Sequence, residues 1–568
     1  MRNLEHPGRS PVHAAGGMAA TSHPLATSAA IDVLRSGGNA MDAAVAACAV
    51  QGVVEPQSTG IGGDCFVLYA PEGSGEIIAF NGSGRAPGQA TPEWFADQGV
   101  SEITEHSPHA VTVPGAVDAW CRLLEDHGTR SIADALQYAI HYAHEGFPIH
   151  DRIGFDWKLC EAMLAKDPTA KRIFLPDGTA PKPGSLHRQT ELAATLEVIA
   201  AEGRDGFYQG AVAEDIVGHL QSLGGGHVLD DFTNAAGQYV TPIKTSYRGH
   251  EVYECPPNGQ GIAALIILNI LAEMGLDKLD PLSPERLHLF IEAGRLAYAE
   301  RNALVSDPDQ VDVPVDMLLS ADHAAQLRDQ INPGKATVNP ASTGLPGGDT
   351  VYLCVVDKDR NAVSFINSLF MSFGSGLVAP KTGVVLQNRG FSFNLDPAHA
   401  NCIQPGKRPM HTIIPGMLVK DGRAVGTGEF FDIKCGLVFT SIGYRSDPLE
   451  GAPFDEKQGI VPNDDGRVGE GLYAVGWIKR GPTGVISSNR PDGVAVAEHI
   501  HKDFGAVAKD AKPGREAFEK LLKERSIRSV SYADWKKIEA AEIENARGEH
   551  PREKFVTIEE MLDVLVRS

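Results

Sequence analysis

The residue with the clearest chemical use is a threonine, Thr350, in the sequence Gly347-Gly348-Asp349-Thr350. From Thr350 the chain reads TVYLCVVD, a short charged turn and AVSFIN, two runs typical of an antiparallel β-hairpin. If the chain is cut before Thr350, the new α-amine lies within reach of the threonine's own hydroxyl. An α-amine has a pKa near ~8, so it can accept that proton at neutral pH and activate a weak nucleophile. The sequence therefore predicts cleavage at Asp349-Thr350 and a nucleophilic Thr350, and the alternative is an ordinary threonine at a strand start.

Further segments, in order over residues 12–426, resemble one enzyme family. They are GMAATSHPLATSAAIDVLRSGGNAMDAAVAACAVQGVVEPQSTGIGGDCFVLY, HAVTVPGAVDAW, YECPPNGQGIAALIILNIL and LFIEAGRLAYAERNALVSDPD, the last ahead of the GDT element. Together they resemble the γ-glutamyltransferase (glutathione hydrolase) family of N-terminal-nucleophile hydrolases. The resemblance implies an α/β fold, a four-layer αββα sandwich that is truncated here. It also implies that Thr350 attacks the Asp349 carbonyl, that the large and small fragments stay associated, and that Thr350 then acts on small-molecule γ-glutamyl or related acyl amides.

The resemblance also assigns residues around the nucleophile. Ser368, eighteen residues after Thr350, stands where the family has a threonine that hydrogen-bonds the nucleophile. Members that bind γ-glutamate strongly hold it with Asn, Gln and Asp, and the matching positions here are Phe370, Arg389 and Ser392. Without the acid, a substrate ammonium loses its natural partner. This pattern looks more like the subgroup that includes acylase-like relatives.

Three more residues are candidates for binding the substrate. Arg85, in FNGSGRAP, carries a guanidinium that can pair with a carboxylate through two hydrogen bonds, and its alternative role is a structural ion pair. His411 and Thr412, in KRPMHT, match two serines that orient the substrate carboxylate in the family. The family's oxyanion donors are backbone amides of a Gly-Gly pair well after this segment. The resemblance ends near Gly426, before that pair, so we expect this part of the site to be missing.

Local signals predict the elements that position these residues. Helical spacing covers Pro24 to Arg35 and stops at a glycine pair, and Asn39 is a cap for a second helix. Ser283-Pro284 has the cap and first-turn proline of another helix. Residues 336–349 are polar and rich in glycine and proline, which predicts an exposed loop ahead of Thr350.

The sequence changes character after residue 426. Residues 427–568 resemble the C-terminal part of adrenodoxin-reductase-type ferredoxin–NADP reductases, most distinctly in GWIKRGPTGVI. The resemblance implies vestigial flavin and nucleotide contacts at Trp477, Gly484, Val485 and Ile486. A flavoprotein of this kind also needs a Gly-x-Gly-x-x-Gly turn between strand and helix, and no well-placed copy occurs, so we expect no cofactor. The predicted domains are residues 1–349, 350–426 and 427–568.

Composition and net charge limit the classes of binding partner. A formal net charge of −22 disfavours nucleic acid and anionic membrane surfaces, and no apolar run is long enough to cross a bilayer. The eight cysteines are scattered without CxxC spacing, which favours buried free thiols and indicates no metal site. The first residues lack a signal-type apolar region, so we expect a cytoplasmic protein.

Three functions stay open: a γ-glutamyltransferase-like hydrolase or transferase, an FAD-dependent NADP oxidoreductase, or an inactive fusion of two remnants.

Overall fold

The computed structural model describes residues 14–336 and 350–424 and, beyond them, shorter stretches: 453–455, 460–469, 472–475, 479, 489–504, 520–525, 530, 532–545, 555 and 558–567. The chain divides into two compact units, Met1–Leu437 and Val438–Ser568. The predicted domain boundaries at residues 349 and 426 stay predictions. None of the described helices combines the length and hydropathy that a membrane crossing requires.

Six strands form the larger sheet of the first unit, and every neighbouring pair is antiparallel. Their order across the sheet is β1 (Gly17–Ala20), β9 (Val351–Asp357), β10 (Ala362–Ser368), β2 (Asp64–Ala70), β3 (Ile78–Gly82) and β6 (Gln238–Val240). The pairing of β9 with β10 confirms the hairpin predicted after Thr350. This hairpin lies inside the sheet, so the candidate nucleophile directly precedes an internal strand.

A smaller sheet faces the first. It has four antiparallel strands in the order β12 (Arg423–Ala424), β11 (Met417–Lys420), β8 (His250–Glu254) and β7 (Ile243–Tyr247). Between the two sheets lies an apolar cluster that contains Phe66, Leu68 and Ile366 from one sheet and Met417 and Val419 from the other. Because alternate residues of a strand point to opposite faces, the remaining faces must be covered by helices.

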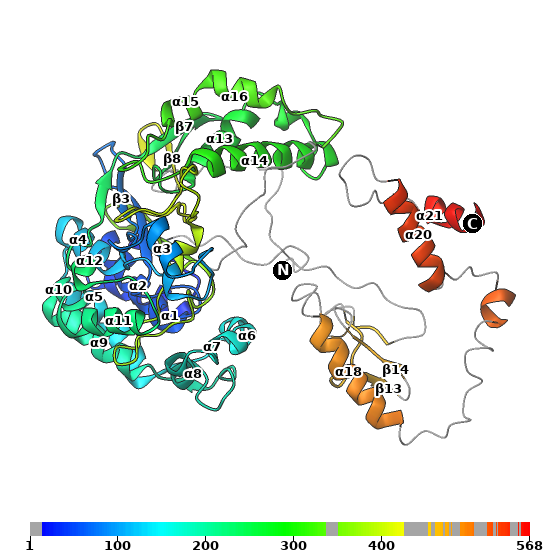
Figure 1. Cartoon of the computed structure of the whole chain (residues 1–568), viewed down its shortest axis with the longest axis horizontal. Helices are drawn as coiled ribbons and strands as arrows, with labels where there is room; N and C mark the ends of the chain where they lie inside the picture. The colour runs from blue at the N-terminus through cyan, green and yellow to red at the C-terminus, as the bar shows by residue number, and fades with distance from the viewer. Residues whose placement is uncertain are drawn as a thin grey trace. The chain divides into compact units, whose positions relative to one another are not determined.

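Helices cover both outer faces. On the larger sheet, buried residues of α1 (Pro24–Arg35), α2 (Ala40–Val54), α4 (Ala116–His127) and α5 (Ile132–Glu145) pack with Val67, Val355 and Phe365. On the smaller sheet the cover is α13 (Gly261–Leu271), α14 (Pro284–Leu304) and α16 (Ala321–Arg328). Figure 1 shows α13 and α14 beside β7 and β8. The result is the predicted αββα sandwich.

The predicted helix starts are confirmed. Asn39 accepts hydrogen bonds from the backbone of Met41 and Asp42 at the start of α2, and Ser283 accepts from Arg286 at the start of α14.

Most other helices come between α5 and β6 in the sequence: α6 (Asp151–Leu159), α7 (Glu161–Leu164), α8 (Pro168–Phe174), α9 (Thr190–Glu202), α10 (Asp205–Tyr208), α11 (Gly210–Ser222) and α12 (Leu229–Thr233). Short pieces complete the unit: α3 (Pro92–Asp97), η1 (Pro108–Ala110), β4 (Phe147–Pro148), β5 (Leu186–His187), η2 (Leu276–Lys278), α15 (Val315–Leu318) and η3 (Arg389–Ser392).

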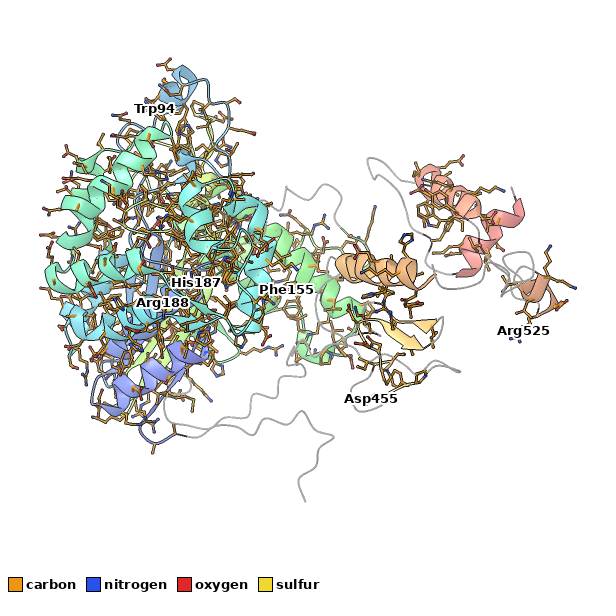
Figure 2. The ribbon with its side chains drawn as sticks, turned by 90° about the horizontal axis from the view of Figure 1, so that it is seen from below. Trp94, Phe155, His187, Arg188, Asp455 and Arg525 are labelled. Carbon is orange, nitrogen blue, oxygen red and sulfur yellow. The ribbon has the colours of Figure 1, made fainter. Side chains whose placement is uncertain are left out.

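An aromatic cluster stabilises the helical layer around α6 and α8. The Trp157 ring lies 4.9 Å from the ring of His187 and 5.5 Å from that of Phe373, between ring centroids. His187 is labelled within this layer in Figure 2. Its burial lowers its pKa to about 4, so it is a neutral core residue. Phe373 ties the layer to the loop that follows β10 and so supports the site.

The second unit contains the hairpin β13 (Arg467–Gly469) and β14 (Leu472–Tyr473) and the helices α18 (Asn489–Phe504), α20 (Tyr532–Glu544) and α21 (Ile558–Arg567). Arg467 on β13 pairs with Asp503 on α18 at 2.6 Å. Of the seven cysteines that the structure describes, four are buried: Cys48, Cys65, Cys255 and Cys402. Cys435 lies outside the described residues.

Candidate functional site

Strand register places four polar residues in a row across the larger sheet. Ser368 at the end of β10 is opposite Asp64 at the start of β2. The neighbouring pairs Asn367–Val351 and Cys65–Gly82 put Thr350 beside Ser368 and Ser83 beside Asp64. All four belong to the face that looks toward the smaller sheet, because they share the alternation of Phe66 and Ile366. The row therefore lies at one end of the interface between the sheets.

Thr350 and Ser368 are in direct contact. Their hydroxyl oxygens lie 2.9 Å apart. Thr350 is exposed, whereas Ser368 is fully buried. The geometry brings together the predicted nucleophile and the residue predicted to support it. Asp349, the other side of the predicted cleavage site, lies outside the described residues.

Two N–H groups also point at the Ser368 oxygen. The backbone N–H of Phe370 donates to it at 3.0 Å, and Nη2 of Arg389 donates at 3.3 Å. Phe370 has a φ of 83°, a left-handed conformation that a non-glycine residue holds only where its surroundings enforce it. The Arg389 guanidinium stacks 4.1 Å from the centre of the Phe370 ring, which helps to hold both residues.

Arg389 is a buried cation with no direct counter-ion among the residues that the structure describes. Its side chain has no ion pair within 4.0 Å among the described residues, its Nε has no hydrogen-bond partner there, and its Nη1 donates to Thr412 Oγ1 at 2.7 Å. Burial lowers its pKa to about 9, and the nearby negative charge of Asp64 opposes that shift. The predicted binding residues Arg389 and Thr412 thus lie together, next to Ser368.

His411 and Asp64 form a buried pair behind this cluster. His411 Nε2 and Asp64 Oδ2 are 3.1 Å apart, and both side chains have no exposed surface. Burial, followed by the charge of Arg389, lowers the His411 pKa to about 4 against the attraction of Asp64, so the imidazole is neutral. The Asp64 oxygen Oδ1 accepts from the backbone of Gly84 and Gly115 and from Gln387 Nε2. The carboxylate is fully bonded.

Asp64 and Gln387 are the residues that sequence reasoning missed. The only local signal for Asp64 is an acid directly after a Gly-Gly turn, and its partners lie up to 347 residues away. His411, a predicted substrate-binding residue, belongs to this structural pair, and its role in binding stays a prediction.

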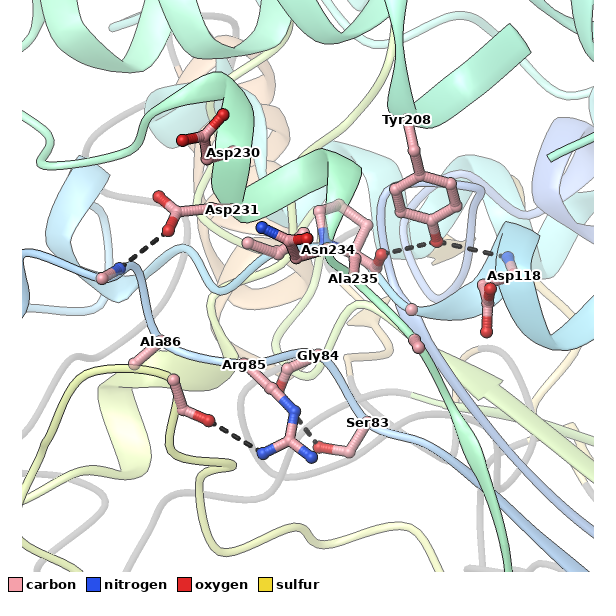
Figure 3. Close-up of a pocket in the computed structure, with 16 residues that line it drawn as sticks. Ser83, Gly84, Arg85, Ala86, Asp118, Tyr208, Asp230, Asp231, Asn234 and Ala235 are labelled. Carbon is pink, nitrogen blue, oxygen red and sulfur yellow. Dashed lines mark hydrogen bonds between the residues drawn. The ribbon is translucent and has the colours of Figure 1, made fainter. Parts of the chain in front are cut away.

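Arg85 has its own set of ion-pair and hydrogen-bond partners. It forms ion pairs with Asp309 at 2.9 Å and Asp307 at 3.6 Å, and its Nη1 donates to the Gly406 carbonyl. Figure 3 shows it at a cavity of about 160 Å³, which Ser83, Asp118, Tyr208, Asp231 and Asn234 also line. Among the described residues it has no hydrogen bond to Thr350, Ser368 or Arg389. Structural ion pairs account for its geometry, and a role in carboxylate binding stays a prediction.

The positions predicted to contact a flavin or nucleotide, Trp477, Gly484, Val485 and Ile486, lie outside the described residues. Among the residues that the structure does describe, no cluster of three potential metal ligands occurs. The described part of the chain thus offers one candidate catalytic arrangement, the row headed by Thr350.

Comparison with known proteins decides the family. The profile of the Gamma-glutamyltranspeptidase family matches residues 26–428. The chain belongs to this family. It is 41% identical over 408 residues to the "Glutathione hydrolase-like YwrD proenzyme" of Bacillus subtilis (strain 168), which covers 72% of this chain and 77% of the relative. It is 37% identical over 420 residues to the "Oxamate amidohydrolase proenzyme" of Klebsiella pneumoniae, covering 73% and 78% of the two chains.

A solved structure agrees with this assignment. The crystal structure of cephalosporin acylase from Bacillus halodurans matches with a TM-score of 0.68 and 39% identity, covering 75% of this chain and 79% of that one. The predicted N-terminal-nucleophile hydrolase fold and the predicted class of enzyme, a hydrolase or acyltransferase of the gamma-glutamyltranspeptidase family, are confirmed. The family match ends at residue 428, so the resemblance of residues 427–568 to reductases stays a prediction.

Proposed function

We propose that this chain is a proenzyme that cuts itself before Thr350 and then hydrolyses or transfers acyl amides with Thr350 as nucleophile. The observation that carries the proposal is the 2.9 Å contact between the hydroxyls of Ser368 and of Thr350, the residue directly before the internal strand β9. Thr350 is exposed, as a nucleophile that must meet a substrate needs to be. A two-chain product fits the relatives, which are named proenzymes.

The chemistry follows from one residue that carries both groups. The α-amine of Thr350 takes the proton from Oγ1, Oγ1 adds to the amide carbonyl carbon, and the amine returns the proton to the leaving nitrogen as the C–N bond breaks. The acyl group is then an ester on Thr350. Water or an acceptor amine adds to this ester with the same base, which releases the acid or the new amide and restores the hydroxyl. No metal or cofactor enters these steps.

The proposed substrates are acyl amides whose acyl group carries no ammonium. Among the described residues, no carboxylate contacts Thr350, Ser368 or Arg389. The carboxylate of Asp64 is buried and already accepts its full set of hydrogen bonds. Ser392 stands at the predicted ammonium position, and its hydroxyl donates to backbone carbonyls. A substrate ammonium would meet the charge of Arg389 instead of an acid.

Two experiments test the proposal, one on self-cleavage and one on the substrate. In the first, denaturing gels of wild-type, Thr350→Ala and Thr350→Ser protein follow the appearance of fragments 1–349 and 350–568. We expect self-cleavage in the wild type and the serine variant and none in the alanine variant.

The second experiment compares two substrates, glutaryl-p-nitroanilide and γ-glutamyl-p-nitroanilide, which differ only in the ammonium. We expect the glutaryl compound to react at least ten-fold faster. Cleavage of Thr350→Ala would refute the nucleophile, and a preference for the γ-glutamyl compound would refute the substrate class alone.

The rival functions rest on residues 427–568. We propose that this segment derives from a reductase and binds no FAD or NADP, because the chain has no well-placed Gly-x-Gly-x-x-Gly turn. Stoichiometric flavin in the purified protein would overturn this. The cytoplasmic location stays a prediction.

A further inference from the structure

The hydrogen bonds around Ser368 fix the direction in which its hydroxyl points. Its oxygen accepts from the backbone N–H of Phe370 and from Nη2 of Arg389. Both groups can only donate, and a hydroxyl oxygen has two acceptor positions and a single proton. With both acceptor positions in use, the proton must go to the third neighbour, Thr350 Oγ1, 2.9 Å away. Thr350 is therefore the acceptor in this contact.

The orientation of the Ser368 hydroxyl leaves the Thr350 hydroxyl proton free to point elsewhere, because the Thr350 oxygen is the acceptor in their contact. The liberated α-amine of Thr350 is then the adjacent base. The positive charge of Arg389 lies nearby, since two hydrogen bonds of 2.9 Å and 3.3 Å connect Thr350 Oγ1 to Nη2 through the Ser368 oxygen. The guanidinium is thus within about 6 Å of the nucleophilic oxygen.

We propose that Arg389 is a positioning residue of the proposed nucleophile: it turns the Ser368 hydroxyl toward Thr350, and its charge favours the unprotonated form of the Thr350 α-amine. This inference rests on the proposed function, because the amine exists only after self-cleavage. It assigns the guanidinium an electrostatic task that is separate from binding substrate.

The charge of Arg389 is well placed to act in this way. Its side chain is fully buried, so bulk water does not screen it. Thr412 Oγ1 holds one end of the guanidinium and the Phe370 ring covers one face. Among the described residues no carboxylate pairs with it within 4.0 Å. An unpaired buried cation disfavours a second positive charge close to it.

Other titratable groups lie on the elements that pack around the site. The negative charge of Asp64 on β2 counteracts the effect of the Arg389 charge on the amine, but Asp64 lies one strand beyond Ser368 and is bonded to four donors. His411, from the loop before β11, is neutral because its pKa is lowered to about 4. The charge of Glu254 on β8 adds to the effect of burial in raising the pKa of Tyr352 on β9. Burial raises the pKa of Glu254 itself to about 8, so its carboxyl group is mostly protonated at neutral pH. Arg389 is the charged group with a hydrogen bond to Ser368.

The expected shift follows from Coulomb's law. A unit charge about 6–9 Å from the amine, at an effective dielectric constant of about 20–40, lowers the amine pKa by roughly one to two units. Asp64 offsets part of this. We therefore expect a net effect of about one unit, which would place the amine near pH 7 instead of its ordinary ~8.

The first experiment compares Arg389→Gln, which removes the charge, with Arg389→Lys, which keeps it. After cleavage is verified by gel, kcat/KM is measured against pH with an acyl p-nitroanilide that carries no charge. We expect the acidic limb to rise by about one unit in Arg389→Gln and to stay within about 0.3 units of the wild type in Arg389→Lys. An unchanged limb in Arg389→Gln, whatever the loss of rate, would overturn the proposal.

A second experiment needs no variant and decides the matter if Arg389→Gln fails to fold or to cleave. The cleaved wild-type protein is treated briefly with cyanate at a series of pH values, and mass spectrometry follows carbamylation of the Thr350 amine. Half-maximal reactivity near pH 7 supports the inference, and a value of 8 or above overturns it. If no fragment begins at Thr350, the proposed function fails and this inference fails with it. If the fragment forms but its amine is ordinary, only the inference fails.

Discussion

Replacing Ser368 with alanine should weaken both the fold and the self-cleavage. The hydroxyl joins Thr350, Phe370 and Arg389, and the residue is fully buried. With a methyl group in its place, one backbone N–H and one guanidinium N–H lose their acceptor. A buried unsatisfied donor costs about 1–3 kcal/mol, and more if it is charged. The expected loss of unfolding free energy is therefore about 3–5 kcal/mol.

The assay separates this loss from the cleavage itself. Urea unfolding followed by circular dichroism is measured for Thr350→Ala and for the double variant Thr350→Ala/Ser368→Ala, neither of which should cleave. Ser368→Thr keeps the hydroxyl and is the matched control. In the background with Thr350 intact, Ser368→Ala should slow cleavage by about ten-fold, the effect of one lost hydrogen bond to Oγ1. Equal unfolding midpoints for the two alanine-background proteins would refute the hydrogen-bond reasoning.

Further predictions concern packing and pH. Gly84→Ala should destabilise the first unit by roughly 3 kcal/mol, because a Cβ there would lie 1.6 Å from the Val113 carbonyl oxygen and would displace the backbone that binds Asp64. The control, Gly218→Ala in α11, meets no atom within 4 Å and should raise the midpoint of urea unfolding. Glu254→Gln should flatten the pH dependence of stability. Burial raises the Glu254 pKa from 4.5 to about 8, so the folded state keeps a proton that the unfolded state has lost, and stability falls as pH rises through this window. An identical pH profile in the variant would exclude Glu254 as the cause.

Local chemistry explains why much of the fold was predictable. The cap at Asn39, the Ser283-Pro284 start of α14 and the hairpin after Thr350 depend on neighbours in sequence, and each appears where it was expected. The proximity of Thr350 and Ser368 was predictable for the same reason, because the hairpin turn sets the register between them.

The rest of the site depends on contacts between distant segments. Asp64 meets His411 across 347 positions, so no spacing rule indicates the pair. The resemblance implied that Arg389 replaces a family glutamine. Only the packing of Phe370 and Thr412 around it shows a buried cation that has no counter-ion among the described residues. For Arg85 the sequence left two roles open, substrate binding and a structural ion pair. The structure shows ion pairs with Asp307 and Asp309, more than two hundred residues away, and substrate binding stays a prediction.

The central claim is that Thr350, once it is the first residue of its fragment, carries the acyl group. The most direct measurement is intact-mass analysis of wild-type protein mixed with glutaryl-p-nitroanilide and quenched in acid within the first turnovers. We expect a fragment of residues 350–568 and the same fragment heavier by one glutaryl group, with the adduct mapped to the Thr350 hydroxyl. An uncut chain, or an adduct on any other residue, would contradict it.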